Sequence, residues 1–175
     1  MMPACGELPH ASDDPAPDLE NIIEYLGNNG GVLIGTEEEG RARSAAITQI
    51  DQLNSILGTH RSPPGLGHNN PPPDEGEAVV GRVINGVSDE ITRIQIELKL
   101  ETPNALEVAK ATSKLRSFWN WLGKKADMAI DSFVKAATAA AGVAVAAALS
   151  PDLMPVLEKT IRLVGDWLRT IVLPF

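Results

Sequence analysis

The stretch that decides the fold is residues 102–175, which reads TPNALEVAKATSKLRSFWNWLGKKADMAIDSFVKAATAAAGVAVAAALSPDLMPVLEKTIRLVGDWLRTIVLPF. Its first part carries apolar residues at mostly three- and four-residue spacing, with most charged residues between them. That period places the apolar side chains on one face of a helix. Thr102 and Pro103 suit its start, because threonine caps free backbone N–H groups and proline fits the first helical position. The pattern predicts a long amphipathic helix and, after a break at Ser150 and Pro151, a second one over residues 153–175.

The tract between these helices, residues 136–151, contains no charged residue and is rich in alanine. Small residues spaced four apart lie on one stripe of a helix, where a second helix can approach closely. We therefore predict helix packing or oligomerisation along this stripe. Its residues are Ala136, Ala140, Gly142, Ala144 and Ala148.

The same tract raises the question of membrane association. A spanning helix needs about 20 mostly apolar residues, and this run is shorter and is closed by Asp152. Tryptophan and lysine on both sides of an apolar segment are nevertheless typical of a membrane interface. The candidates for interfacial contact are Trp119, Trp121, Lys124, Lys125 and Trp167. Two alternatives remain: a soluble helical hairpin with the alanine stripe in its core, or a membrane-associated hairpin.

Aromatic residues and charge are both distributed unevenly. Six of the seven aromatic residues lie beyond residue 117, which predicts that large buried contacts are concentrated there. Residues 1–75 carry 12 acidic and 3 basic side chains (net −9), whereas residues 76–175 carry 11 and 12 (net +1). An acidic first part argues against nucleic acid as a partner, because sequence-independent binding needs clustered lysine and arginine. The single cysteine, Cys5, permits no disulfide within the chain and fits a reducing, cytoplasmic compartment.

Composition divides the chain into four parts. Residues 1–17 are rich in proline and acidic residues, and we expect them to be disordered. Residues 18–57 predict a small helical hairpin: a short helix over 18–26, and a second helix that opens with a capping box from Thr36 to Glu39. Glu37, Glu38 and Glu39 are expected to form a solvated first turn. Residues 58–76 predict a linker rich in proline and glycine, and residues 77–175 a C-terminal helical domain.

Within the predicted linker, residues 65–73 read Gly-Leu-Gly-His-Asn-Asn-Pro-Pro-Pro. This tract resembles a short Gly-His-Asn-x-Pro-Pro tract of uncharacterised bacterial and prophage-encoded proteins. The resemblance covers about nine residues and implies a bacterial or mobile-element origin without a particular activity. Proline-rich segments are bound by protein partners in extended form, although a docked turn or a passive linker are alternatives. The candidate partner-binding residues are Gly67, His68, Asn69, Asn70, Pro71 and Pro72.

The beginning of the C-terminal domain carries a heptad-like seam on a predicted helix over residues 77–101. Its spacing alternates between four and three residues, which favours pairing of helices within the chain or between copies. The seam consists of Val80, Ile84, Val87, Ile91, Ile94 and Leu98.

Signals of catalysis are absent from the sequence. His10, His60 and His68 all lie in surroundings rich in proline or glycine, and no nucleophile elbow, phosphate-binding loop or paired metal motif occurs. The sequence therefore predicts an all-α, non-enzymatic interaction or oligomerisation protein without cofactor or metal. Its expected partner is another protein or a second copy. The alternative is an effector that associates with the inner membrane through residues 136–151 and the helix at 152–175.

Overall fold

The computed structural model describes residues 14–28, 30–60, 75–133 and 141–172, and it places side chains at 14–28, 30–58, 85–124 and 153–172. This part of the chain is helical, which confirms the all-α class. Its helices are α1 (Leu19–Gly27), α2 (Glu37–His60), α3 (Glu75–Lys99), α4 (Ala105–Phe133) and α5 (Ala141–Ile171).

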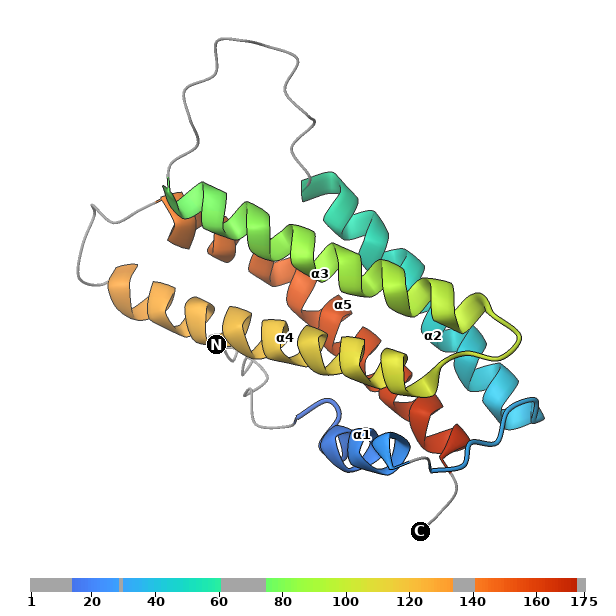
Figure 1. Cartoon of the computed structure of the whole chain (residues 1–175). Coiled ribbons are helices and arrows are strands. Elements are labelled where there is room, and N and C mark those ends of the chain that lie inside the picture. Colours follow the sequence, from blue (N-terminus) through green and yellow to red (C-terminus); the bar gives the residue numbers. More distant parts are fainter. Residues whose placement is uncertain (1–13, 29, 61–74, 134–140, 173–175) are drawn as a thin grey trace, which may run out of the picture.

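The four long helices form an antiparallel bundle (Figure 1). Helix α2 packs on α3 and α5, α4 packs on the same two helices, and α3 also contacts α5 across the bundle. Consecutive helices run in opposite directions, which is the up-down-up-down arrangement of four-helix bundles. The most extensive contact joins α2 to α5, so helices far apart in the sequence are neighbours in the structure.

One hydrophobic core connects the N-terminal and C-terminal parts of the described chain. It includes Ile50 and Leu53 of α2, Ile91 of α3, Leu115 of α4 and Leu157 of α5. Each of these side chains is fully buried. Residues 18–57 and the C-terminal helices are therefore packed together rather than forming separate units.

Helices α1 and α2 do not pair as the predicted hairpin. Among the described residues, α1 packs on α4 and α5 and makes no packing contact with α2. The physical reason is size, because a helix of nine residues and its neighbour would bury too little apolar surface between them. Each helix instead buries its apolar face against the larger C-terminal helices.

The helix starts agree with the sequence at α2 and differ at α4. The backbone N–H of Glu39 donates to Thr36 Oγ1 at 3.1 Å, which confirms the threonine cap. At α4 the capping side chain is Asn104, whose Oδ1 accepts from the Glu107 N–H at 3.2 Å. The prediction of Thr102 as the cap was wrong, and α4 begins at Ala105.

Helix α5 continues through Pro151 and Pro155, so the predicted break at Ser150 and Pro151 does not occur. A proline inside a helix removes a hydrogen bond and costs about 3 kcal/mol. The helix face that follows is fully buried at Leu153, Leu157 and Ile161. Burying such side chains contributes about 1.5–3 kcal/mol each. This gain offsets the free-energy cost of the two prolines.

The heptad-like seam on α3 faces the core where its side chains are described. Val87, Ile91, Ile94 and Leu98 are buried, and α3 packs on three other helices of the bundle. The seam therefore pairs helices within the chain. The side chains of Val80 and Ile84 lie outside the described residues.

Within residues 14–28, 30–60, 75–133 and 141–172, no helix combines the length and the apolar character needed to cross a bilayer.

Candidate functional site

A buried polar cluster joins the start of α2 to the end of α5. The indole N–H of Trp167 donates to Glu39 Oε1 at 2.8 Å, and Arg43 Nε donates to the same oxygen at 2.6 Å. The other carboxylate oxygen accepts from the Gly35 N–H at 3.3 Å. Gly35 has a φ of 91°, a left-handed conformation that glycine adopts without strain.

This cluster corrects two predictions from the sequence. Glu39 was expected in a solvated first turn, but it is only 2% exposed. Trp167 was a candidate for contact with a membrane interface in one of the two alternatives, but it is fully buried in the bundle. A buried carboxylate requires hydrogen-bond donors, and the indole of Trp167 is one of them, so both residues are held inside by the same contact.

Hydrogen bonding also changes the acidity of Glu39. Burial favours the neutral acid and raises its pKa, but the hydrogen bonds from Trp167, Arg43 and Gly35 stabilise the carboxylate more strongly. The pKa of Glu39 therefore lies below its usual value. A carboxyl whose pKa is lowered on folding adds stability above its unfolded pKa, and this stability is lost as the pH falls through the folded pKa.

We predict that the urea midpoint of unfolding stays nearly constant above about pH 5 and falls steeply below pH 4.5, the ordinary pKa of a glutamate. Glu39→Gln should flatten this fall, because the glutamine amide does not take up a proton in this pH range. Glu37→Gln, on the exposed side of the same helical turn, removes the same charge outside the buried cluster and is the matched control. Equal slopes for the two variants would mean that Glu39 does not drive the acid sensitivity.

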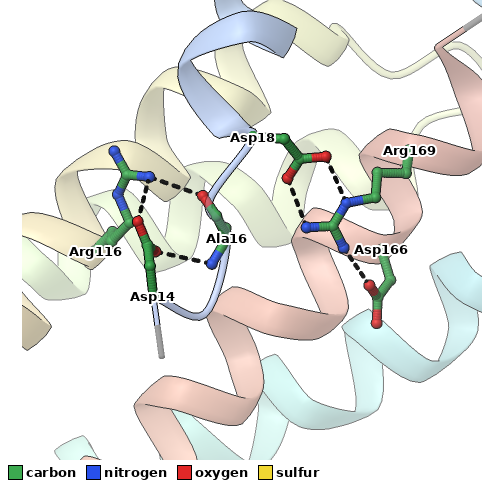
Figure 2. A network of polar contacts seen from close by, with 6 residues as sticks. All are labelled: Asp14, Ala16, Asp18, Arg116, Asp166 and Arg169. Atoms are coloured by element: carbon green, nitrogen blue, oxygen red, sulfur yellow. Dashed lines mark hydrogen bonds and ion pairs between the residues drawn. The ribbon is translucent and has the colours of Figure 1, made fainter. Parts of the chain in front are cut away.

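A second polar network fixes the segment before α1 onto α5 (Figure 2). Arg169 of α5 donates from Nε and Nη2 to the two carboxylate oxygens of Asp18, at 2.7 and 2.6 Å. Its Nη1 donates to Asp166 Oδ1 at 2.5 Å. The hydrogen bonds from Arg169 lower the pKa of Asp18, outweighing its partial burial. Bidentate arginine–carboxylate pairs of this kind fix the relative orientation of the two groups in addition to their electrostatic attraction.

The same segment is bound to α4 by Arg116 (Figure 2). Its Nη1 donates to the Ala16 carbonyl at 2.8 Å and to Asp14 Oδ2 at 3.2 Å. Its Nη2 pairs with Glu20 at the start of α1. One arginine from each of two neighbouring helices therefore holds an acidic segment between them.

A third feature is a cavity of about 390 Å³ between α3 and α4, which we call the α3–α4 groove. It is lined by the apolar residues Val87, Leu115, Phe118 and Trp121, of which Trp121 is half-buried and the others are buried, and Glu90 and Lys114 lie beside them. The rings of Phe118 and Trp121 are stacked, with centroids 5.8 Å apart and an angle of 18° between their planes. Lys114 Nζ lies 2.5 Å from Glu90 Oε1, so an ion pair connects the two helices.

The predicted interfacial residues occupy different environments. Trp119 is buried like Trp167 and packs in the core, so neither can face a membrane from its present position. Trp121 is half-buried in the α3–α4 groove, and Lys124 is exposed. The side chains of the remaining predicted site residues lie outside the part that the structure describes. These residues are Lys125, Ala136, Ala140, Gly142, Ala144, Ala148, Gly67, His68, Asn69, Asn70, Pro71 and Pro72.

Four polar residues of these networks were not anticipated as a site: Asp18, Glu39, Arg116 and Arg169. Each of them has a partner far away in the sequence: Asp18 and Arg169, for example, are 151 positions apart. The available signal was the charge difference between the acidic first part and the balanced second part of the chain. That difference indicates electrostatic attraction between the two parts. It does not identify the residues that form the ion pairs.

Comparisons of the chain with protein-family models, curated proteins and solved structures gave no match. Within the residues whose side chains the structure places, no group of three or more histidine, cysteine, aspartate or glutamate side chains could hold a metal ion.

Proposed function

We propose that this chain is a non-enzymatic helical interaction protein, an adaptor or scaffold that binds a partner protein through the α3–α4 groove. The supporting observation is the stacked pair of Phe118 and Trp121 beside that cavity. Aromatic residues are enriched at the centres of protein interfaces, and tryptophan is among the residues that contribute most to binding. The membrane alternative has less support, because Trp119 and Trp167 are buried.

The groove also defines the chemistry of a suitable partner. Its apolar surface fits the side chains of an amphipathic helix, which binds in a groove through anchors three or four residues apart. Glu90 Oε1 is paired with Lys114, and the buried Glu90 Oε2 lies 3.7 Å from Arg93 Nη1. The charges beside the apolar residues are therefore largely paired within the chain, and the partner chemistry that the groove defines is apolar.

Site-specific photo-crosslinking in cells that produce the chain tests this proposal. The photoreactive amino acid p-benzoylphenylalanine is placed at Trp121 in the groove, and in a second chain at Lys159, an exposed position on α5. We expect a discrete protein adduct from position 121 and none from position 159. Indiscriminate labelling from both positions, or no protein adduct from position 121, would contradict a binding role for the groove.

Gly86 provides a way to block the groove without disturbing the core. It lines the groove, and a Cβ added there meets nothing within 4 Å. Gly86→Leu should therefore abolish the adduct from position 121 while the melting temperature stays equal or rises, because a glycine inside a helix is destabilising by roughly 0.5–1 kcal/mol. Gly58→Leu on α2, which also meets nothing within 4 Å, is the matched control and should leave the adduct unchanged.

A further inference from the structure

Helix α1 is bound to the bundle in the manner of a docked peptide. It has nine residues, and an isolated helix of that length is marginal in water. Among the described residues it packs on α4 and α5, not on α2, to which the chain connects it. Its helical form therefore depends on the surface between α4 and α5, which we call the α1 site.

The α1 site recognises two properties of its occupant. Leu19, Ile22 and Leu26 lie on one face of α1 and are buried, so the centre of the contact is apolar. At the N-terminal end of α1, Arg169 holds Asp18 and Arg116 holds the Ala16 carbonyl (Figure 2). The site thus fits an acidic amphipathic helix, because it combines an apolar surface with the two basic side chains of Arg116 and Arg169.

The segment enters the site closely over α5. Ala16 is fully buried, and a Cβ added at Gly165 would lie 3.4 Å from the Ala16 Cβ. The segment at Ala16 therefore lies directly on α5, within van der Waals range of the Cβ position of Gly165. A crosslink between positions 16 and 165 would therefore report that the α1 site is occupied.

The connection to α2 allows α1 to leave without unfolding the bundle. Residues 27–31, from the last residue of α1 onward, read Gly-Asn-Asn-Gly-Gly. The Gly30 N–H donates back to the Tyr25 carbonyl of α1 at 2.9 Å, and the chain is bound to α5 where the Leu33 N–H donates to the Ile171 carbonyl at 2.7 Å. Separation of α1 from its site breaks its contacts with α4 and α5 and leaves those between α2 and α5 in place. Local opening of such a small element requires less free energy than global unfolding.

We propose that the α1 site is an exchangeable docking site and that α1 of a second copy of this chain is its occupant, in a reciprocal exchange between two bundles. The exchanged helix makes the same contacts as it does within one chain, so the two forms have similar energies apart from the cost of association. The link of about five residues reaches roughly 17 Å, and the two bundles must therefore meet at the end where α1 docks. This inference is independent of the α3–α4 groove.

Two chains with one cysteine each test the exchange directly. Both carry Cys5→Ser, one also carries Ala16→Cys, and the other carries Gly165→Cys. The Cβ separation of 3.4 Å at this pair is close to the separation of about 3.5–4.5 Å in disulfides. When the two chains are mixed with oxidised glutathione, a heterodimeric disulfide forms in high yield only if α1 of one chain occupies the site of the other.

We expect the heterodimer yield to exceed, several-fold, that of an Ala16→Cys chain mixed with a Lys159→Cys chain, in which the second cysteine is on the exposed side of α5. The yield should rise with protein concentration. Salt should accelerate the exchange by screening the Arg116 and Arg169 ion pairs, without changing the final ratio of heterodimer to monomer.

A chain that carries Ala16→Cys and Gly165→Cys together should form the disulfide internally when dilute, which shows that the substitutions preserve the fold. Internal disulfide without a heterodimer above the control would overturn the proposal.

Discussion

Replacing Trp167 by alanine is expected to lower the free energy of unfolding by about 3–5 kcal/mol, the range for removal of a large buried aromatic side chain. Trp167 is fully buried, and its indole N–H is one of the donors to the buried carboxylate of Glu39. The variant loses core contacts and also leaves Glu39 with one donor fewer. Since a domain of this size has a total stability of about 5–15 kcal/mol, this loss is a large share of the total. Urea denaturation followed by far-UV circular dichroism measures the change.

Two further variants separate the causes of this loss. Trp167→Phe keeps most of the apolar volume and removes only the hydrogen bond, for which we expect a smaller loss, about 1.5–3 kcal/mol for a bond to a charged group. Trp121→Ala removes the same type of side chain from the half-buried α3–α4 groove, and it should cost less than Trp167→Ala. If both alanine variants lose the same stability, the deep burial of Trp167 is not the main cause of its loss.

Leu53→Ala on α2 is expected to destabilise the bundle by about 2–5 kcal/mol, because it leaves a cavity at a fully buried position. The three tryptophans all lie on α4 and α5. A substitution in α2 should therefore shift the unfolding transition seen by tryptophan fluorescence to lower urea, together with the transition seen by circular dichroism. Coincident transitions are the expected behaviour of one cooperative unit.

The matched control for this experiment is Ser55→Ala, two residues further along α2 on its exposed side. It should leave both midpoints within error of the original chain. Separate transitions in the Leu53→Ala chain, with tryptophan fluorescence unaffected, would show that α2 folds apart from the C-terminal helices. The division of the chain at residues 58–76 would then also be a division of the folded structure.

Local features of the fold could be predicted because they depend on residues three or four positions apart. The Thr36 cap is one example, and the seam from Val87 to Leu98 on α3 is another. The break at Pro151 was predicted by the same local reasoning and was wrong. The buried face at Leu153 and Leu157 outweighs the local preference of proline, and the strength of that packing depends on helices elsewhere in the chain.

The environments of the tryptophans show where sequence reasoning reached its limit. Trp119 and Trp121 are two positions apart, about 200° around a helix, so both could not face the core. Periodicity does not say which neighbour each face meets. The role of Trp167 depends on Glu39, 128 positions away, and neither residue alone indicates a buried pair. The sequence thus identified the aromatic residues as important but could not assign their surroundings.

The pairing of α2 with α5 has a consequence for the order of events during protein synthesis. The main partner of α2 ends at Ile171, and at translation rates of about 5–20 residues per second the roughly 110 residues after α2 take about 5–20 s to make. During that interval the apolar faces of α1 and α2 have no complete native surface to cover them. The net charge of −9 on residues 1–75 adds electrostatic repulsion between such chains. The acidic first part therefore opposes association between chains in which α2 and α5 have not yet paired.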